Sequence, residues 1–104
     1  MIRQAFIMWL KPGGSEEYRR LHGEVPRQVE LDEEAAGVVR ETIWLRGEML
    51  FVVSEVRDEL TWERARHSLA GQEWAATLTP YLVMDDTGSV KTELLEEVYD
   101  HTVP

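Results

Sequence analysis

The chain opens with MIRQAFIMWL at positions 1–10, followed by the turn KPGG at positions 11–14 and the segment SEEYRRLH at positions 15–22. Apolar side chains occupy both alternating faces of residues 2–10, which predicts an inner strand covered on both sides. Proline and glycine in the turn end this strand. Ser15 is the predicted N-cap of a helix that runs to about Gly23. A strand therefore leads directly into a helix.

The predicted helix carries Tyr18 and His22 one turn apart. Both fall with Leu21 and Val25 in a stripe roughly 100° wide, which is the width of a core-facing surface. Histidine has the unperturbed pKa closest to neutrality, so an inward-facing histidine is a candidate for proton transfer. The residues leave open the alternative that His22 is a packing residue whose nitrogens bond to the backbone.

The remaining segments are predicted from periodicity and breakers. A helix is predicted over Pro26–Ala36, ending at Gly37, and two strands over Val38–Leu45 and Met49–Val56, joined by a short turn. A further helix begins at Asp58, is interrupted near Gly71 and resumes over Gln72–Leu78. The last element is a strand over Glu93–Tyr99, where the pattern also fits a helix. The resulting order is β, α, β, β, α, β.

This order predicts an α+β fold of the ferredoxin-like type, βαββαβ, with a four-stranded antiparallel sheet and helices on one face only. Residues 1–104 are expected to form a single domain. The other face of the sheet needs a cover, and a second copy of the chain is the simplest one. We therefore predict a homodimer of the dimeric α/β-barrel type.

Composition excludes several functional classes. The chain has 20 acidic and 11 basic residues, a formal net charge of -9, which disfavours binding to nucleic acid or to anionic membranes. It has no cysteine, and its three histidines lack metal-ligand spacing, so no metal site is predicted. No apolar run approaches the roughly 20 residues of a membrane span and no signal peptide is evident, which predicts a cytoplasmic protein.

Glu41 interrupts an otherwise apolar row formed by Val39, Ile43 and Leu45 on one side of its strand. A carboxylate in such a row is costly unless it is paired or lines a wet pocket. Glu41 is therefore a candidate hydrogen-bond partner for a ligand hydroxyl. Two other interpretations remain open at this point: an ion pair with Arg40 or Arg3, and a slip of register at the start of the strand.

Trp74 is the second candidate ligand contact. Its small neighbours, Ala75 and Ala76, leave room around the ring. A flat apolar wall with a few polar groups suits a neutral polyol, whose C–H faces stack while its hydroxyls form hydrogen bonds. The absence of a GxSxG motif and of a phosphate-binding glycine loop argues against hydrolases and nucleotide enzymes.

An ordered set of residues resembles the L-rhamnose mutarotase family over nearly the whole chain. The set comprises Met1-Ile2-Arg3-x-Ala5-Phe6-x-Met8, Pro12, Glu16-Glu17-Tyr18-x-x-x-His22, the Phe51–Glu55 strand, Trp62, Trp74 and Glu93-Leu94-x-Glu96-x-Val98. The resemblance implies a ferredoxin-like dimer without a cofactor that interconverts the α and β anomers of L-rhamnose. It also implies that His22 is the proton donor and that Tyr18 and Trp74 contact the substrate.

The chain departs from that family opposite the Tyr18 and His22 pair. The family has an aromatic residue at the position of Glu41, a second tryptophan at the position of Ala75 and another near Pro26. The expected function is therefore mutarotation of L-rhamnose or a related aldose, a small neutral monosaccharide. Two alternatives remain: a cofactor-independent monooxygenase or cyclase of the same dimeric type, and a non-catalytic sugar-binding dimer.

Overall fold

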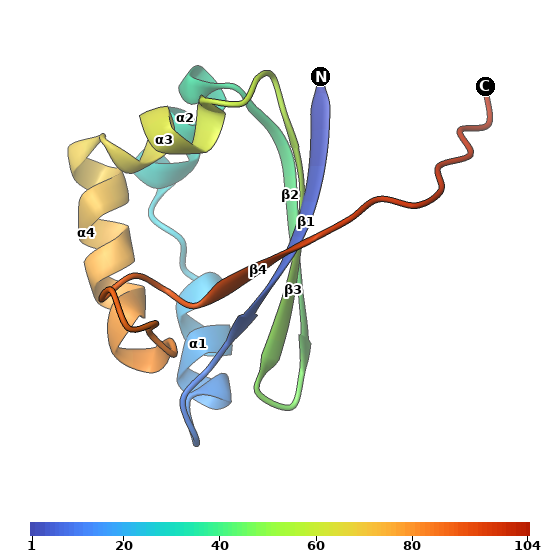
Figure 1. Ribbon diagram of the computed structural model, residues 1–104. Coiled ribbons are helices and arrows are strands. Elements are labelled where there is room, and N and C mark those ends of the chain that lie inside the picture. Colours follow the sequence, from blue (N-terminus) through green and yellow to red (C-terminus); the bar gives the residue numbers. More distant parts are fainter.

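The computed structural model describes all 104 residues. The elements, in chain order, are β1 (Ile2–Trp9), α1 (Ser15–His22), α2 (Arg27–Ala36), β2 (Val38–Arg46), β3 (Met49–Val56), α3 (Thr61–Arg66), α4 (Leu69–Leu78), a 3-10 turn (Thr79–Tyr81) and β4 (Thr92–Leu95). All strand pairs are antiparallel, in the order β2-β3-β1-β4, and the helices lie on one face of the sheet (Figure 1). The predicted ferredoxin-like fold is confirmed.

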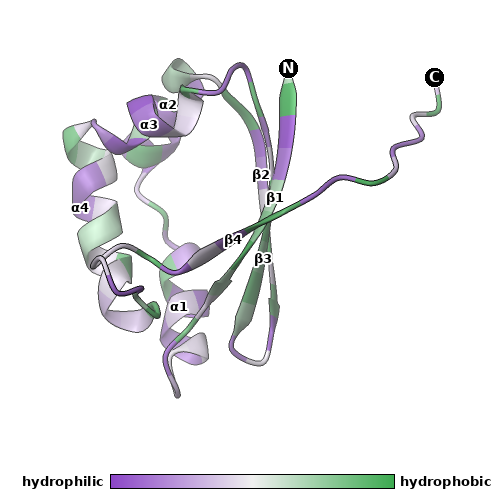
Figure 2. Cartoon of the chain, viewed as in Figure 1, coloured by the Kyte–Doolittle hydropathy of each residue, from purple (hydrophilic) through white to green (hydrophobic).

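β1 is an inner strand, as its two apolar faces predicted. Phe6 pairs with Val52 of β3 on one side and with Leu94 of β4 on the other. In β3, Leu50, Val52 and Val56 are almost fully buried and face the helices. Figure 2 shows that β1 and β3 are hydrophobic in the half nearer the β2–β3 turn, and that β1 has a hydrophilic stretch between this half and its hydrophobic N-terminal tip. The two halves of the sheet therefore differ in polarity.

Four buried residues, Leu10, Tyr18, Leu50 and Leu82, form a hydrophobic core cluster. Leu50 is fully inaccessible to solvent, and the exposed fraction of Tyr18 is only 4%. Ile43 of β2 packs against the edge of this cluster. Because Tyr18 is embedded in the cluster, α1 is held firmly on the sheet, and the orientation of the next helical turn, which carries His22, follows from it.

Helix ends differ from the sequence-based expectation in two places. Ser15 is the first residue of α1 and the N-cap is Gly14, whose carbonyl accepts the Tyr18 N–H, so the prediction for Ser15 was wrong. The interruption predicted at Gly71 falls instead at residues 67–68. There the Ser68 hydroxyl caps α4 by accepting the Gly71 N–H at 3.0 Å. Gly71 is required for space, because a Cβ there would lie 2.5 Å from the Ala65 carbonyl oxygen.

The C-terminal strand is shorter than predicted. β4 ends at Leu95, and residues 96–104 form no regular element and extend away from the body of the molecule (Figure 1). Glu97 and Asp100 bond to the side chain of Arg3 instead of continuing the backbone ladder along β1.

The end predicted for the acidic helix at Gly37 is confirmed. Gly37 is the C-cap of α2 and has a φ of +117°.

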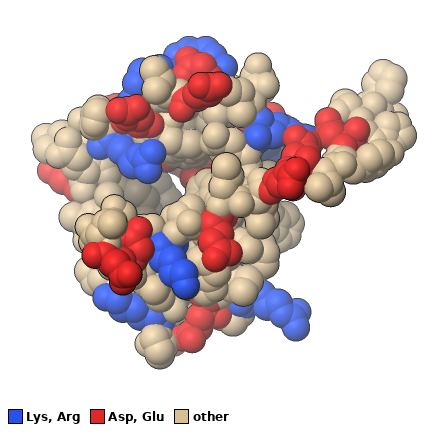
Figure 3. Space-filling model, viewed as in Figure 1, with Lys and Arg blue, Asp and Glu red and all other residues tan.

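Charges of both signs are distributed over the face shown in Figure 3, and the surface is hollowed between the helical layer and the sheet. The four helices are all too short and too polar to cross a lipid bilayer.

Candidate active site

His22 is the last residue of α1, and its side chain is half-buried. Its Nδ1 is 3.0 Å from the carbonyl oxygen of Tyr18. Because a carbonyl can only accept, Nδ1 carries the hydrogen, and the lone pair of the neutral ring is on Nε2. Burial lowers the pKa of His22, against the smaller opposing effect of this hydrogen bond. At neutral pH the imidazole is therefore uncharged and able to accept a proton through Nε2.

Tyr18 stacks beside His22, with ring centroids 4.3 Å apart. No protein group bonds to its hydroxyl, and no buried polar side-chain atom in the molecule lacks a partner, so solvent reaches this hydroxyl. Burial, and secondarily the charge of Glu41, raise the pKa of Tyr18 well above its usual range. The phenol keeps its proton at every physiological pH and is available as a hydrogen-bond donor to a ligand.

Trp74 approaches the same imidazole from α4. Its ring meets His22 edge-on, with centroids 5.3 Å apart and an interplanar angle of 69°. The structure thus brings Tyr18, His22 and Trp74 together although they come from two helices far apart in the sequence. Trp74 is only partly buried, and Ala75 and Ala76 beside it are exposed. A tryptophan face next to a proton acceptor is suited to hold a sugar ring.

A row of polar residues crosses the helix-facing side of the sheet. In the strand register, Ser54 of β3 pairs with Gln4 of β1 and with Glu41 of β2. The Trp62 indole N–H donates to the Ser54 hydroxyl at 3.2 Å. Sequence reasoning identified only Glu41. Gln4 and Ser54 were missed, although both interrupt apolar alternation at inward-facing positions in their own strands, which is the same signal.

Glu41 has no ion-pair partner, so the open interpretation that it pairs with Arg40 or Arg3 is wrong. Arg3 bonds to Glu97 and Asp100 instead. The start of β2 does contain a register irregularity, between Val38 and Arg40. This bulge turns Val38 toward the helices in place of Val39, and Glu41 stays on the same side as Ile43.

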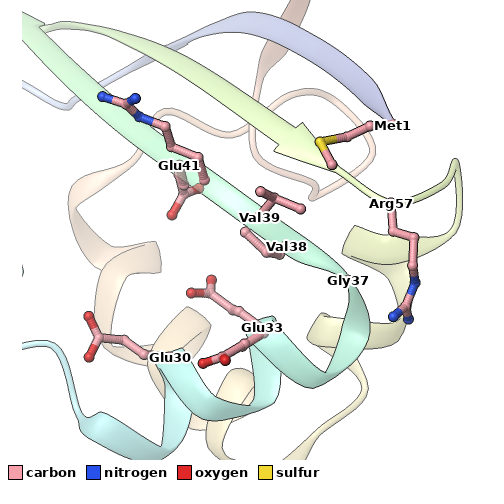
Figure 4. A pocket seen from close by; sticks show the side chains of 10 residues that line it. Met1, Glu30, Glu33, Gly37, Val38, Val39, Glu41 and Arg57 are labelled. Carbon is pink, nitrogen blue, oxygen red and sulfur yellow. The ribbon is translucent and has the colours of Figure 1, made fainter.

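The Glu41 carboxyl lies in an open cavity of about 680 Å³ between β2 and α2. Glu41 and Glu33 face the same space in this cavity (Figure 4), and Glu30 lines it as well. Glu41 is an exposed residue overall, but protein atoms surround its carboxyl and replace much of the water. Burial, and secondarily the charge of Glu33, raise the pKa of Glu41 to about 7. The group is thus partly protonated at neutral pH.

This raised pKa predicts a pH-dependent cost in stability. The folded protein retains the Glu41 proton between pH 4.5 and about 7, where the unfolded chain has lost it, so stability falls as the pH rises through this window. We expect Glu41→Gln to stabilise the protein by on the order of 1 kcal/mol at about pH 8, after allowance for solvent screening, and to change little at about pH 4.

Urea unfolding of the wild type and of Glu41→Gln at both pH values measures this difference. Glu59→Gln, which removes an exposed glutamate from the loop before α3, is the matched control and should show no pH-dependent gain. Equal stabilities of Glu41→Gln and wild type at about pH 8 would contradict the raised pKa.

The other two histidines, His67 and His101, are exposed. No three histidine, aspartate or glutamate side chains are grouped in a way that could hold a metal ion. The groups in mutual contact are a neutral imidazole, a phenol and an aromatic wall, and a carboxyl of raised pKa on the facing sheet acts on the phenol through its charge. Together they are suited to proton transfer at neutral pH on a small hydroxylated ring.

Comparison with known proteins identifies relatives along nearly the whole chain. A family model for L-rhamnose mutarotase matches residues 3–101. An L-rhamnose mutarotase of Klebsiella pneumoniae is 30% identical over 101 residues, covering 95% of this chain and 97% of the relative.

Solved structures show the same architecture. The L-rhamnose mutarotase FA22100 from Formosa agariphila superposes with a TM-score of 0.82 at 20% identity, over 98% of this chain and 100% of that one. A dimeric ferredoxin-like protein from an uncultured marine organism superposes with a TM-score of 0.63 at 14% identity, covering 97% of each chain. At these identities the superpositions establish the fold.

Proposed function

The chain belongs to the L-rhamnose mutarotase family, a family of isomerases, and we propose that it interconverts the α and β anomers of L-rhamnose or a related aldose. The observation that carries this proposal is the imidazole of His22, whose Nδ1 is bound to a backbone carbonyl while Nε2 is free. Mutarotation requires one proton to leave the anomeric hydroxyl and one to reach the ring oxygen. His22 is the residue that exchanges the proton.

Three residues around His22 bind the sugar in this proposal. The Tyr18 hydroxyl, which has no protein partner, donates to a sugar hydroxyl. Trp74 stacks on the C–H face of the ring, which the 5.3 Å separation of the indole and imidazole centroids permits. Glu41 hydrogen-bonds to a hydroxyl where the family has an aromatic contact. The substrate is thus a small neutral monosaccharide, bound by residues 1–104 acting as one domain.

Saturation-transfer NMR of anomer exchange tests this function directly. The protein is mixed with L-rhamnose, L-fucose and related aldoses, and exchange above the buffer rate for at least one sugar is the expected result. Binding of a sugar without enhanced exchange would show a non-catalytic sugar-binding protein. The absence of both for all sugars would overturn the proposal.

A monooxygenase or cyclase function has less support. The family match and the 30% identity are to mutarotases, so only the fold is held in common with other dimeric α/β-barrel proteins. Oxygen consumption with a polycyclic phenol is the assay that would reveal such an activity. The cytoplasmic location expected from the sequence stays a prediction.

We also propose that the protein is a homodimer that pairs through the open face of its sheet. Trp44, Val53 and Leu95 lie on the face away from the helices, and the exposed fraction of Trp44 is 63%. Exposed apolar side chains clustered on one face are typical of an interface. A dimeric ferredoxin-like protein among the structural neighbours has a comparable fold.

Charge placed on this face is expected to weaken the dimer. Trp44→Glu puts like charges opposite one another across a two-fold axis and removes a large apolar contact, so we expect at least about a tenfold increase in the dissociation constant. Sedimentation equilibrium at micromolar concentration measures it. Leu69→Glu, at an exposed apolar position of α4 on the helical side, is the control and should leave the dimer intact. A monomeric wild type would overturn the proposed dimer.

A further inference from the structure

The neutral tautomer of His22 leaves one half of the proposed reaction without a proton source. With the hydrogen of Nδ1 committed to the Tyr18 carbonyl, Nε2 begins as an acceptor. It takes the proton of the anomeric hydroxyl, and it has none to give to the ring oxygen at the same moment. Tyr18 retains its own proton too strongly, because burial and the charge of Glu41 both oppose its ionisation. Transfer of both protons in one step therefore needs a second group, across the sugar ring, that can give a proton.

Glu41 is a carboxyl on the helix-facing side of the sheet, and its charge reaches Tyr18. Ile43 packs against the cluster that contains Tyr18, and Glu41 is two residues along β2 on the same side, about 6.5 Å farther along the strand. Its charge acts on Tyr18, which in turn stacks on His22. Tyr18 is therefore in contact with the imidazole on the helical wall and within electrostatic reach of the carboxyl on the sheet wall.

The surroundings of Glu41 favour its protonated form and leave it free to react. Its carboxyl forms no ion pair and shares a cavity with Glu30, Glu33 and Glu34 of α2, while Arg40 and Arg57 lie on the cavity lining without bonding to it. Burial raises its pKa, and the charge of Glu33 on α2 adds to this effect. A carboxyl held without a partner among like charges is a cost to the fold. A role in proton transfer explains why the position is acidic.

We propose that Glu41 is a second catalytic residue, the acid that protonates the ring oxygen while His22 deprotonates the anomeric hydroxyl. This inference rests on the proposed mutarotase function. In ring opening, Nε2 of His22 takes the hydroxyl proton, the freed electron pair forms the C1 carbonyl and the bond from C1 to the ring oxygen breaks. The ring oxygen takes the proton of the Glu41 carboxyl. Closure on the opposite face of the carbonyl returns both protons, so the two residues end as they began.

The pH dependence of the catalysed rate follows from the protonation states that His22 and Glu41 must have. His22 must be neutral, so the rate rises with pH through its lowered pKa, and Glu41 must be protonated, so the rate falls again above about 7. The groups that face Glu41 are Glu30, Glu33 and Glu34 from α2 and Tyr18 from α1, with Arg40 and Arg57 at the rim. Of these, Glu33 has a raised pKa, caused by burial and then by Glu30.

Glu41→Gln tests the proposal, because the amide keeps the shape and the hydrogen bonds of the carboxyl but has no proton to transfer. We expect kcat for anomer exchange to fall by about 10²-fold with little change in KM, and the decline of the rate above about pH 7 to disappear. Glu41→Asp should recover part of the rate and restore the decline. Glu59→Gln, in the exposed loop before α3, should behave as wild type.

The outcomes separate this inference from the function on which it rests. If the wild type exchanges anomers and Glu41→Gln retains both the wild-type kcat and the decline of the rate at alkaline pH, the role of Glu41 as an acid is wrong. The mutarotase proposal then remains supported. A rise in KM with unchanged kcat shows that Glu41 only binds the sugar and overturns the role as acid. A wild-type protein that exchanges no anomers overturns both. Far-ultraviolet circular dichroism of each variant verifies that it is folded.

Discussion

Replacing His22 with alanine is expected to reduce the catalysed rate of anomer exchange by about 10²- to 10⁴-fold, the range for the loss of a positioned acid or base. The physical reason is that Nε2 of His22 is the one neutral, unpaired proton acceptor beside Trp74 and Tyr18. Saturation-transfer NMR measures the rate at several protein concentrations, with the uncatalysed exchange in buffer subtracted. The fold should survive, because His22 is only half-buried at the end of α1.

Two variants give this measurement its controls. His67→Ala removes an exposed histidine between α3 and α4 and should leave the rate unchanged. Tyr18→Phe removes the phenol hydroxyl and keeps the backbone carbonyl that orients His22, so we expect a smaller loss than for His22→Ala. If His22→Ala exchanged anomers as fast as His67→Ala, the proposed proton transfer through this imidazole would be wrong.

Leu50→Ala is expected to lower the free energy of unfolding by about 2–5 kcal/mol, the range for truncating a buried leucine. Leu50 is fully inaccessible to solvent and belongs to the cluster with Leu10, Tyr18 and Leu82. Domains of this size have a total stability of about 5–15 kcal/mol, so the loss is a large fraction of it. Urea unfolding at a fixed protein concentration measures the effect, since a dimer's stability depends on concentration.

Leu69→Ala is the matched control for this change. It deletes the same atoms at a position with an exposed fraction of 73%, and should cost no more than about 0.5 kcal/mol. Leu50→Ala should also weaken sugar binding, because Tyr18 belongs to the same buried cluster and would lose a packing neighbour. Equal destabilisation by the two variants would show that Leu50 is not part of a closely packed core.

Much of the fold was predictable because short stretches of neighbouring residues determine where its helices and strands begin and end. The turn at residues 11–14, the glycine after α2 and the short connection between β2 and β3 each end an element through the conformation of a few neighbouring residues. The break between α3 and α4 was misplaced for the opposite reason. Gly71 is conspicuous in the sequence, but it serves close packing against the Ala65 carbonyl, and Ser68 makes the actual cap.

The candidate site was predictable in part. Tyr18 and His22 are one helical turn apart, so their shared face follows from periodicity alone, and the structure brings Trp74 to them as a third ring. Gln4 and Ser54 were not recognised, since each is a single polar residue in its own strand. They become a row with Glu41 only when the register of three strands aligns them.

By itself, the sequence determined the order of strands and helices, the inward face of α1 and the family to which the chain belongs. These depend on periodicity, local turn chemistry and the ordered set of residues along the chain. The tertiary structure alone decided which nitrogen of His22 is free, that Glu41 has no partner and that its carboxyl shares a cavity with acidic side chains of α2. The reason is that proton affinity depends on burial and on the distances to neighbouring charges and dipoles, which come from segments far apart in the chain.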